Sequence, residues 1–312
     1  MNRRGFLALS LAPAAAAWRG RDRCADFHLR FGVTQFDRFD PIADLDRLER
    51  WGYDYCEPSV ARVMALGDAE FEAARRKAAG GRIHVEAMNS FIPAEMKIVG
   101  PDVDRARVEA YVAAALERAD RLGARVVVFG SGGARRVPDG FPRADAWRQL
   151  KEFLRAAGDE IARRQRGMVI GIEALRKAES NIVNTSAEAY RLAVETNHPN
   201  VRVIVDFFHL TAEGESPTIL RRIKDRLVHC HFSNPVQGRF FPREVSECPG
   251  YGPFFENLRA IGYRGRMSLE AGSTDAESDL PAGLAVLRQL YGAACSGRVA
   301  SVGPGLQRRG TA

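Results

Sequence analysis

The chain has 312 residues, of which 46% are hydrophobic and 27% are charged. That composition is typical of a globular protein and excludes a fibrous or largely disordered one, and the length suits one large α/β barrel or two smaller domains. The net charge of +7 comes mainly from arginines spread along the chain. No basic run is interleaved with aromatic residues, so nucleic-acid binding is not expected.

The first residues have the pattern of an export signal. The pair Arg3 and Arg4 precedes an apolar segment from Phe6 to Ala17, which ends in small residues. The pattern resembles a twin-arginine signal peptide, and the segment is too short to span a bilayer. We therefore expect residues 1–24 to be a signal peptide and N-terminal segment. The protein would then be periplasmic or exported, without a stable membrane anchor, or cytoplasmic if the signal is not functional.

From residue 25 onward, short apolar segments alternate with amphipathic ones. The segments predicted as strands are 29–34, 53–57, 82–88, 124–129, 168–173, 201–206, 227–232 and 266–270. The segments predicted as helices are 41–51, 68–79, 102–122, 144–164, 186–196, 217–226, 254–261 and 280–291. The Gly-rich, basic residues 296–312 are expected to form a flexible tail.

Eight strand–helix units in one chain of this length predict a single (β/α)8 TIM barrel over residues 25–295. An open, doubly wound sheet would usually have a Gly-rich turn after its first strand. Here that strand runs into Gln35-Phe36-Asp37, so the barrel is favoured. The five cysteines are widely spaced and form no CxxC pair, and their pairing in an exported protein is left open.

The last four predicted strands end in residues that could ligate a metal. These are Glu173, Asp206, His231 and Glu270. Each alone has a simpler explanation: Asp206 could cap a turn, His231 could be a core histidine, and Glu270 could be a surface acid. Because strand ends meet at one face of a barrel, the four together predict a site in which a cation offsets three carboxylates. The set suits one divalent ion, Mn²⁺ first, with Mg²⁺, Co²⁺ or Zn²⁺ as alternatives.

The chain resembles the xylose isomerase-like sugar isomerases and epimerases, and in particular the ketose 3-epimerases. The matching stretches are Ile170-Gly171-Ile172-Glu173, Val205-Asp206-Phe207-Phe208-His209, His229-Cys230-His231, Pro249-Gly250-Tyr251-Gly252 and Leu269-Glu270. The resemblance implies that the four strand-end residues bind one metal. It also implies that Glu173 and Glu270 act as the catalytic acid–base pair.

Substrate contacts follow from the same resemblance. It assigns His209 and Glu179 to the substrate, and we add Asn89, at the end of the third strand. Many ketose 3-epimerases have an arginine six residues after the metal-binding histidine; here that position is Gln237. Arg239 is the nearest arginine, and we predict it as a further substrate contact. Arg135, Arg239 and Arg243 are candidates for holding a phosphate if the substrate has one. His229 is expected to point away from His231 and to have a structural role.

The predicted activity is proton transfer next to a carbonyl, through a metal-stabilised enediolate, on a small-molecule sugar or sugar derivative. Epimerisation and isomerisation both remain open. The resemblance also implies a homodimer or homotetramer. One alternative is a non-catalytic, metal-containing barrel that binds sugars. An endonuclease-IV-like phosphodiesterase is less expected, because strands two and three end in Glu57 and Asn89 rather than in the additional histidines that such enzymes need.

Overall fold

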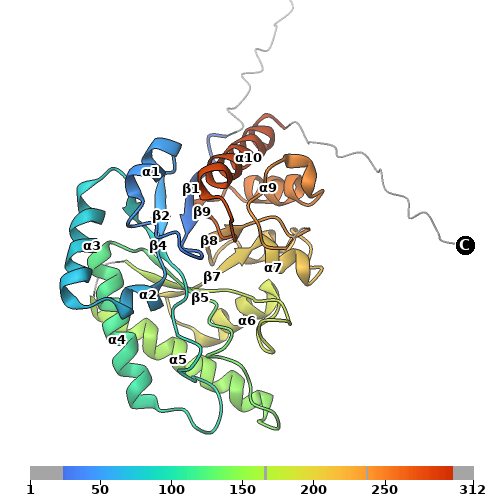
Figure 1. Ribbon diagram of the computed structural model, residues 1–312. Helices are drawn as coiled ribbons and strands as arrows, with labels where there is room; N and C mark the ends of the chain where they lie inside the picture. Colours follow the sequence, from blue (N-terminus) through green and yellow to red (C-terminus); the bar gives the residue numbers. More distant parts are fainter. Residues whose placement is uncertain (1–23, 165–166, 237, 298–312) are drawn as a thin grey trace, which may run out of the picture.

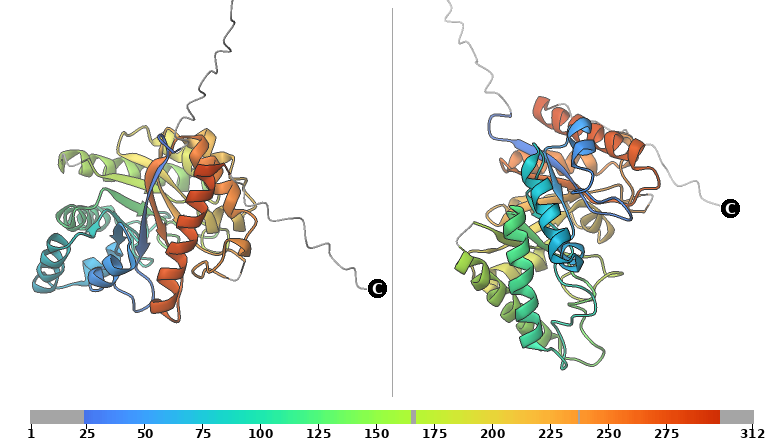
Figure 2. Two further views of the ribbon diagram at one scale, coloured as in Figure 1. Left: turned by 90° about the horizontal axis from the view of Figure 1, so that it is seen from above. Right: turned by 60° about the vertical axis from the view of Figure 1, so that its left-hand side comes forward.

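The structure is a computed structural model that describes residues 24–164, 167–236 and 238–297. Parallel strands form its centre, with helices around the outside (Figures 1 and 2). The strands are β1 (His28–Thr34), β2 (Tyr55–Glu57), β3 (His84–Val85), β4 (Ala87–Met88), β5 (Val126–Phe129), β6 (Val169–Ile172), β7 (Val201–Asp206), β8 (Leu227–Phe232) and β9 (Arg264–Leu269).

The strand order β3-β2-β1-β9-β8-β7-β6-β5-β4 describes a closed barrel, because β3 and β4 are two halves of one strand. Only Glu86 separates them. The Glu86 N–H donates to the Cys56 carbonyl at 3.3 Å, and the Glu86 carbonyl accepts from Arg125 N at 2.9 Å. The third barrel strand therefore joins β2 on one side to β5 on the other. The predicted (β/α)8 TIM barrel is confirmed.

The helices cover the outside of this barrel. They are α1 (Leu45–Trp51), α2 (Val60–Ala65), α3 (Asp68–Gly80), α4 (Arg105–Leu122), α5 (Arg143–Arg164), α6 (Ser186–Thr196), α7 (Phe207–Ala212), α8 (Ile219–Ile223), α9 (Tyr251–Ala260) and α10 (Ala276–Ser296). On α4, one apolar stripe faces the core and Gly123 ends the helix at φ 95°, a left-handed conformation that suits glycine.

Two short helices, α2 and α7, were not predicted, and α8 is shorter than the predicted helix over 217–226. In α7, Phe207–Leu210 are all buried and only Thr211 and Ala212 are exposed, so the helix is too short for a repeated polar face to create a helical period in the sequence. Its start is decided by Asp206, whose Oδ1 accepts from Phe208 N at 2.8 Å.

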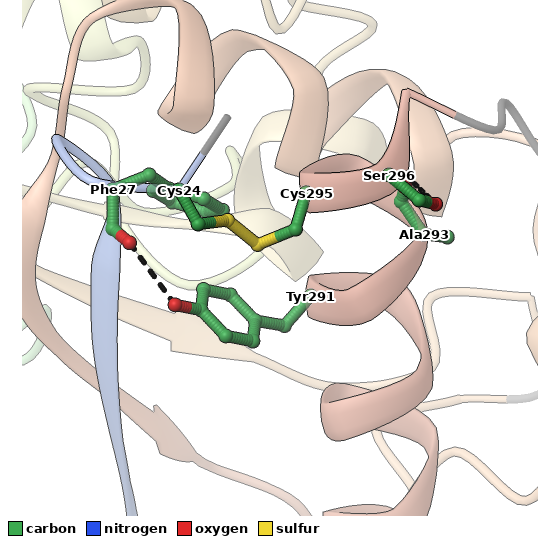
Figure 3. Close-up of a disulfide and its surroundings, with 6 residues drawn as sticks. All are labelled: Cys24, Phe27, Tyr291, Ala293, Cys295 and Ser296. Carbon is green, nitrogen blue, oxygen red and sulfur yellow. Dashed lines mark hydrogen bonds between the residues drawn. A yellow bond between two sulfur atoms is a disulfide. The ribbon is translucent and has the colours of Figure 1, made fainter. Parts of the chain in front are cut away.

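A disulfide between Cys24 and Cys295, with Cα atoms 5.3 Å apart, joins the segment before β1 to the end of α10 (Figure 3). Beside it, the Tyr291 hydroxyl donates to the Phe27 carbonyl at 3.0 Å. Cys24, the last residue of the predicted N-terminal segment, is thus attached to α10. The other three cysteines are buried and unpaired.

Most of the predicted signal peptide and tail lies in residues 1–23 and 298–312, outside the described residues. Among the described residues, no helix combines the length and the hydrophobicity needed to cross a membrane.

Candidate active site

The four predicted metal ligands meet at the carboxyl ends of β6 to β9. One ligand atom from each of Glu173, Asp206, His231 and Glu270 lies within 4.8 Å of the others. His231 Nδ1 is 2.8 Å from Glu270 Oε2 and 3.3 Å from Glu173 Oε1. Glu173, Asp206 and His231 are buried, and Glu270 is partly exposed. The structure therefore brings the predicted set together at the mouth of the barrel.

The sheet itself places these side chains. Asp206 and His231 are register partners on β7 and β8. Glu173 N donates to the Phe129 carbonyl and Glu270 N to the Phe232 carbonyl, each at 3.1 Å, so both glutamates continue the strand ladders. A Cβ atom at Gly130 would lie 2.4 Å from Glu173 Oε2. Glycine at the end of β5 therefore leaves the space that the Glu173 carboxylate occupies.

Arg135 contacts the backbone of the same glutamate, Glu173, and has no exposure to solvent. Its Nη1 donates to the Glu173 carbonyl at 2.9 Å, and its Nη2 donates to the Val183 carbonyl at 3.2 Å. Burial lowers the pKa of Arg135 to about 10, which still leaves it charged at neutral pH. The hypothesis that Arg135 binds a substrate phosphate is wrong, because backbone carbonyls occupy its guanidinium.

The carboxyl groups of the site differ in the direction in which their pKa values are shifted. Burial raises the pKa of Glu173, and the neighbouring Glu270 raises it further. Burial also raises the pKa of Asp206. For Glu270, burial is outweighed by Arg239 and His231, which hold its pKa well below the usual range. Three carboxylates and one imidazole form a hard, oxygen-rich donor set, and a divalent cation such as Mn²⁺ or Mg²⁺ fits them.

His209, from α7, presents a free ring nitrogen to this cluster. Its Nδ1 accepts from Arg176 N at 3.2 Å, so the proton of the neutral ring is on Nε2. Burial lowers the pKa of His209, which favours that neutral ring. Nε2 is buried and has no hydrogen-bond partner among the described residues. It lies 3.6 Å from Asp206 Oδ2 and 3.8 Å from Glu179 Oε2. A donor so placed is suited to a substrate oxygen.

The other predicted substrate contacts, Glu179, Asn89 and Arg239, also lie at the site but already have protein partners. Glu179 pairs with Arg176. Asn89 Nδ2 donates to Glu270 Oε1 at 3.0 Å. The Arg239 guanidinium lies 5.1 Å from the Phe208 ring centre and donates to both Asp206 and Glu270. Arg243 instead pairs with Asp279, away from the cluster, and Gln237 lies outside the described residues.

The comparison with protein families agrees with the fold. Residues 45–290 match the family described as xylose isomerase-like TIM barrel. The chain belongs to this family. The match covers all four candidate ligands and His209.

Curated proteins resemble the chain over part of its length. The chain is 30% identical over 129 residues to an L-ribulose 3-epimerase of Methylomonas sp. (strain DH-1), covering 40% of this chain and 43% of the relative. It is 29% identical over 154 residues to an inosose dehydratase of Lacticaseibacillus casei, covering 43% of this chain and 50% of the relative. The chain thus spans half or less of the length of these relatives.

Solved structures extend the similarity over the whole barrel. A crystal structure of D-psicose 3-epimerase, determined in the presence of D-fructose, matches with a TM-score of 0.73 and 19% identity. The match covers 84% of this chain and 99% of that chain. At this identity the likeness supports the fold of the xylose isomerase-like barrel.

Glu57 and His229 were not predicted from the sequence to lie at the site. Glu57, at the end of β2, lies with Oε1 3.0 Å from His231 Nε2 and Oε2 2.8 Å from His229 Nε2. The prediction that His229 points away from His231 is wrong, because residues two apart on a strand share a face. That spacing, together with the strand-end position of Glu57, was the signal that could have identified them.

Proposed function

We propose that the protein is a divalent-metal-dependent sugar isomerase or epimerase. The observation that carries the proposal is the convergence of three carboxylates and one imidazole at the carboxyl ends of β6 to β9. The unpartnered Nε2 of His209 beside them supports a substrate oxygen at the same place. Membership of the xylose isomerase-like family and the L-ribulose 3-epimerase among the relatives point to sugar chemistry.

Glu173, Asp206, His231 and Glu270 would hold the metal, which we propose to be Mn²⁺. When bound, a divalent ion would polarise the substrate carbonyl and offset the negative charge that develops on its oxygen as the enediolate forms. Asn89 donates to the Glu270 carboxylate, Arg135 binds the backbone carbonyl of Glu173, and Gly130 leaves space for the Glu173 carboxylate. These contacts keep both glutamates directed at the substrate.

Glu173 and Glu270 would carry the proton. One glutamate removes a proton from the carbon next to the carbonyl, and the other returns a proton. Return to the opposite face of the same carbon is epimerisation, and return to the adjacent carbon is isomerisation. The His209 N–H donates to a substrate oxygen, Glu179 accepts from a hydroxyl, and Arg239 anchors the substrate at the mouth of the barrel. Among these reactions, we place the protein nearest to the ketose 3-epimerases.

A second candidate is dehydration of a keto-sugar or keto-cyclitol. It is favoured by the inosose dehydratase among the relatives, and it starts with the same removal of a proton. The two outcomes separate after that step, because a dehydratase expels a hydroxyl from the next carbon.

The test combines elemental analysis of the purified protein with a solvent-exchange panel. Ketoses, aldoses and their oxidised derivatives are incubated in deuterium oxide and followed by NMR. An enzyme of the proposed class contains about one divalent ion per chain and exchanges one carbon-bound proton of its substrate. Loss of water would instead favour dehydration. Bound metal without exchange on any compound would favour the alternative of a sugar-binding barrel.

We also propose that the protein is exported through its twin-arginine segment. The Cys24–Cys295 disulfide supports this location, because such bonds persist mainly in oxidising compartments. Replacement of Arg3 and Arg4 by lysine is expected to retain the protein in the cytoplasm, as measured by cell fractionation. Unchanged fractionation would contradict the proposal. Assembly into a homodimer or homotetramer stays a prediction, to be checked by light scattering.

A further inference from the structure

A buried carboxylate lies directly behind the candidate metal ligands. Glu57 has no solvent exposure. Besides the two histidines that contact it, the Ser268 hydroxyl donates to Glu57 Oε2 at 2.5 Å. The Tyr55 hydroxyl is 2.7 Å from Ser268 Oγ. Both oxygens of Glu57 are therefore held by groups from three other positions on the barrel strands.

These contacts allow one arrangement of protons. Two imidazole nitrogens and one hydroxyl, all of which can donate a hydrogen bond, surround the two oxygens of Glu57. An ionised carboxylate only accepts hydrogen bonds. The Nε2 atoms of both histidines must therefore carry protons that point at Glu57.

The surroundings of the two Nδ1 atoms agree with this arrangement. His231 Nδ1 faces Glu270 and Glu173, so it is the nitrogen directed at the metal ligands. His229 Nδ1 is buried without a hydrogen-bond partner among the described residues. An unprotonated nitrogen is tolerated there better than an N–H, which would lose a hydrogen bond on burial.

We infer that Glu57 is a positioning residue that holds His231 with its Nε2 protonated and its Nδ1 turned toward Glu173, Asp206 and Glu270. The inference rests on the proposed metal site. A metal-bound histidine usually donates its other N–H to a carboxylate or carbonyl, which fixes the ring and its tautomer. Glu57 makes that contact from β2, on the far side of the barrel from the ligands on β6 and β7. His229 and Ser268 hold its second oxygen and prevent the carboxylate from rotating.

The decisive variant is Glu57→Gln, which keeps the size of the side chain but replaces one acceptor oxygen by an NH₂ donor. One of the two histidines then faces a donor and must turn or move its proton. We expect the dissociation constant for Mn²⁺ to rise about 10- to 100-fold, measured by calorimetric titration of the full chain. In the Mg²⁺-loaded protein, ¹⁵N NMR of labelled histidines is expected to show the Nε2–H form of His231 in the wild type and less of it in the variant.

Two control variants make the test specific. Glu86→Gln makes the same chemical change at a buried carboxylate that pairs with Arg30 and Arg266 instead of histidines, and it should leave Mn²⁺ affinity unchanged. Ser268→Ala removes one contact to Glu57 but none to His231, and its effect should stay below about threefold (about 0.6 kcal/mol). If Glu57→Gln does not fold, Glu57→Asp keeps the charge and should weaken Mn²⁺ binding while preserving the tautomer.

The outcomes separate the inference from the proposed function. Unchanged affinity in Glu57→Gln overturns the positioning role. Weaker binding in Glu57→Gln with an unchanged His231 tautomer also overturns it, because it would show only a general structural effect. A wild-type protein that binds no Mn²⁺ overturns the proposed metal site and the role of Glu57 with it.

Discussion

Glu173 and Glu270 occupy different environments although they contact the same histidine. Glu173 is buried beside Gly130 and has a raised pKa, whereas Glu270 is partly exposed and held ionised by Arg239 and His231. Two titratable groups whose environments separate their pKa values are typical of an acid–base pair. The proposed proton transfer therefore depends on both carboxyl groups, and each can be tested by removing its charge.

We expect Glu173→Gln and Glu270→Gln each to lower substrate proton exchange at least about 10²- to 10⁴-fold, because an amide cannot take up a proton from carbon. Solvent-deuterium exchange followed by NMR measures the effect, and circular dichroism checks the fold. Glu86→Gln is the matched control and should exchange at the wild-type rate. Full exchange in both site variants would contradict the mechanism.

Arg239 reaches the site as a planar fork, stacked over Phe208 and directed at Asp206 and Glu270. Lysine keeps the charge but loses the fork. For Arg239→Lys we expect KM for the sugar to rise about tenfold, roughly the loss of one charge-assisted hydrogen bond, with a smaller change in kcat. Steady-state kinetics give both values. An unchanged KM would show that Arg239 does not anchor the substrate.

At the scale of elements, the site depends on loops that hold the strand ends. Arg135 lies in the segment after β5, and its buried side chain binds the carbonyls of Phe129, Glu173 and Val183. One side chain thus joins the ends of β5 and β6 to the loop before α6. The same loops leave room at Gly130 for the Glu173 carboxylate.

Arg135→Met is expected to lower the free energy of unfolding by about 3–5 kcal/mol, because it leaves several buried carbonyls without donors. Urea denaturation measures the change. Arg136→Met is the matched control, since Arg136 is exposed, and its effect should stay within about 0.5 kcal/mol. Equal stability of the two variants would contradict the structural role of Arg135.

At the scale of the whole molecule, the Cys24–Cys295 disulfide joins the segment before β1 to the end of α10 across 271 residues of sequence. A cross-link over so long a loop restricts the unfolded chain strongly. It lies where the first strand and the last helix run side by side (Figures 2 and 3).

The double variant Cys24→Ser/Cys295→Ser is expected to be less stable than the oxidised protein by about 2–5 kcal/mol. Chemical denaturation with and without dithiothreitol measures this. The reductant should destabilise the wild type toward the level of the variant and leave the variant itself unchanged. An unchanged free energy of unfolding in the wild type after its disulfide has been reduced would refute the stabilising role.

The barrel and its four candidate ligands could be predicted because both depend on local patterns. The strands at 201–206 and 227–232 and the helix at 186–196 match the structure to the residue. Runs of buried apolar residues indicate strands, and amphipathic periods indicate helices. Strand ends of a parallel barrel meet at one face, so residues after neighbouring strands could be placed together from the sequence. The ion itself, the substrate and export remain predictions.

The order of the elements and the face on which the site lies can therefore be read from the sequence alone. The meeting of residues that are distant in the sequence depends on the folded barrel. Glu57 contacts His229 across 172 residues, and Cys24 bonds Cys295 across 271. Arg135 donates to buried backbone carbonyls and is not available to bind a phosphate. These contacts form between segments that share no local pattern, and their geometry exists only once the barrel has closed through Glu86.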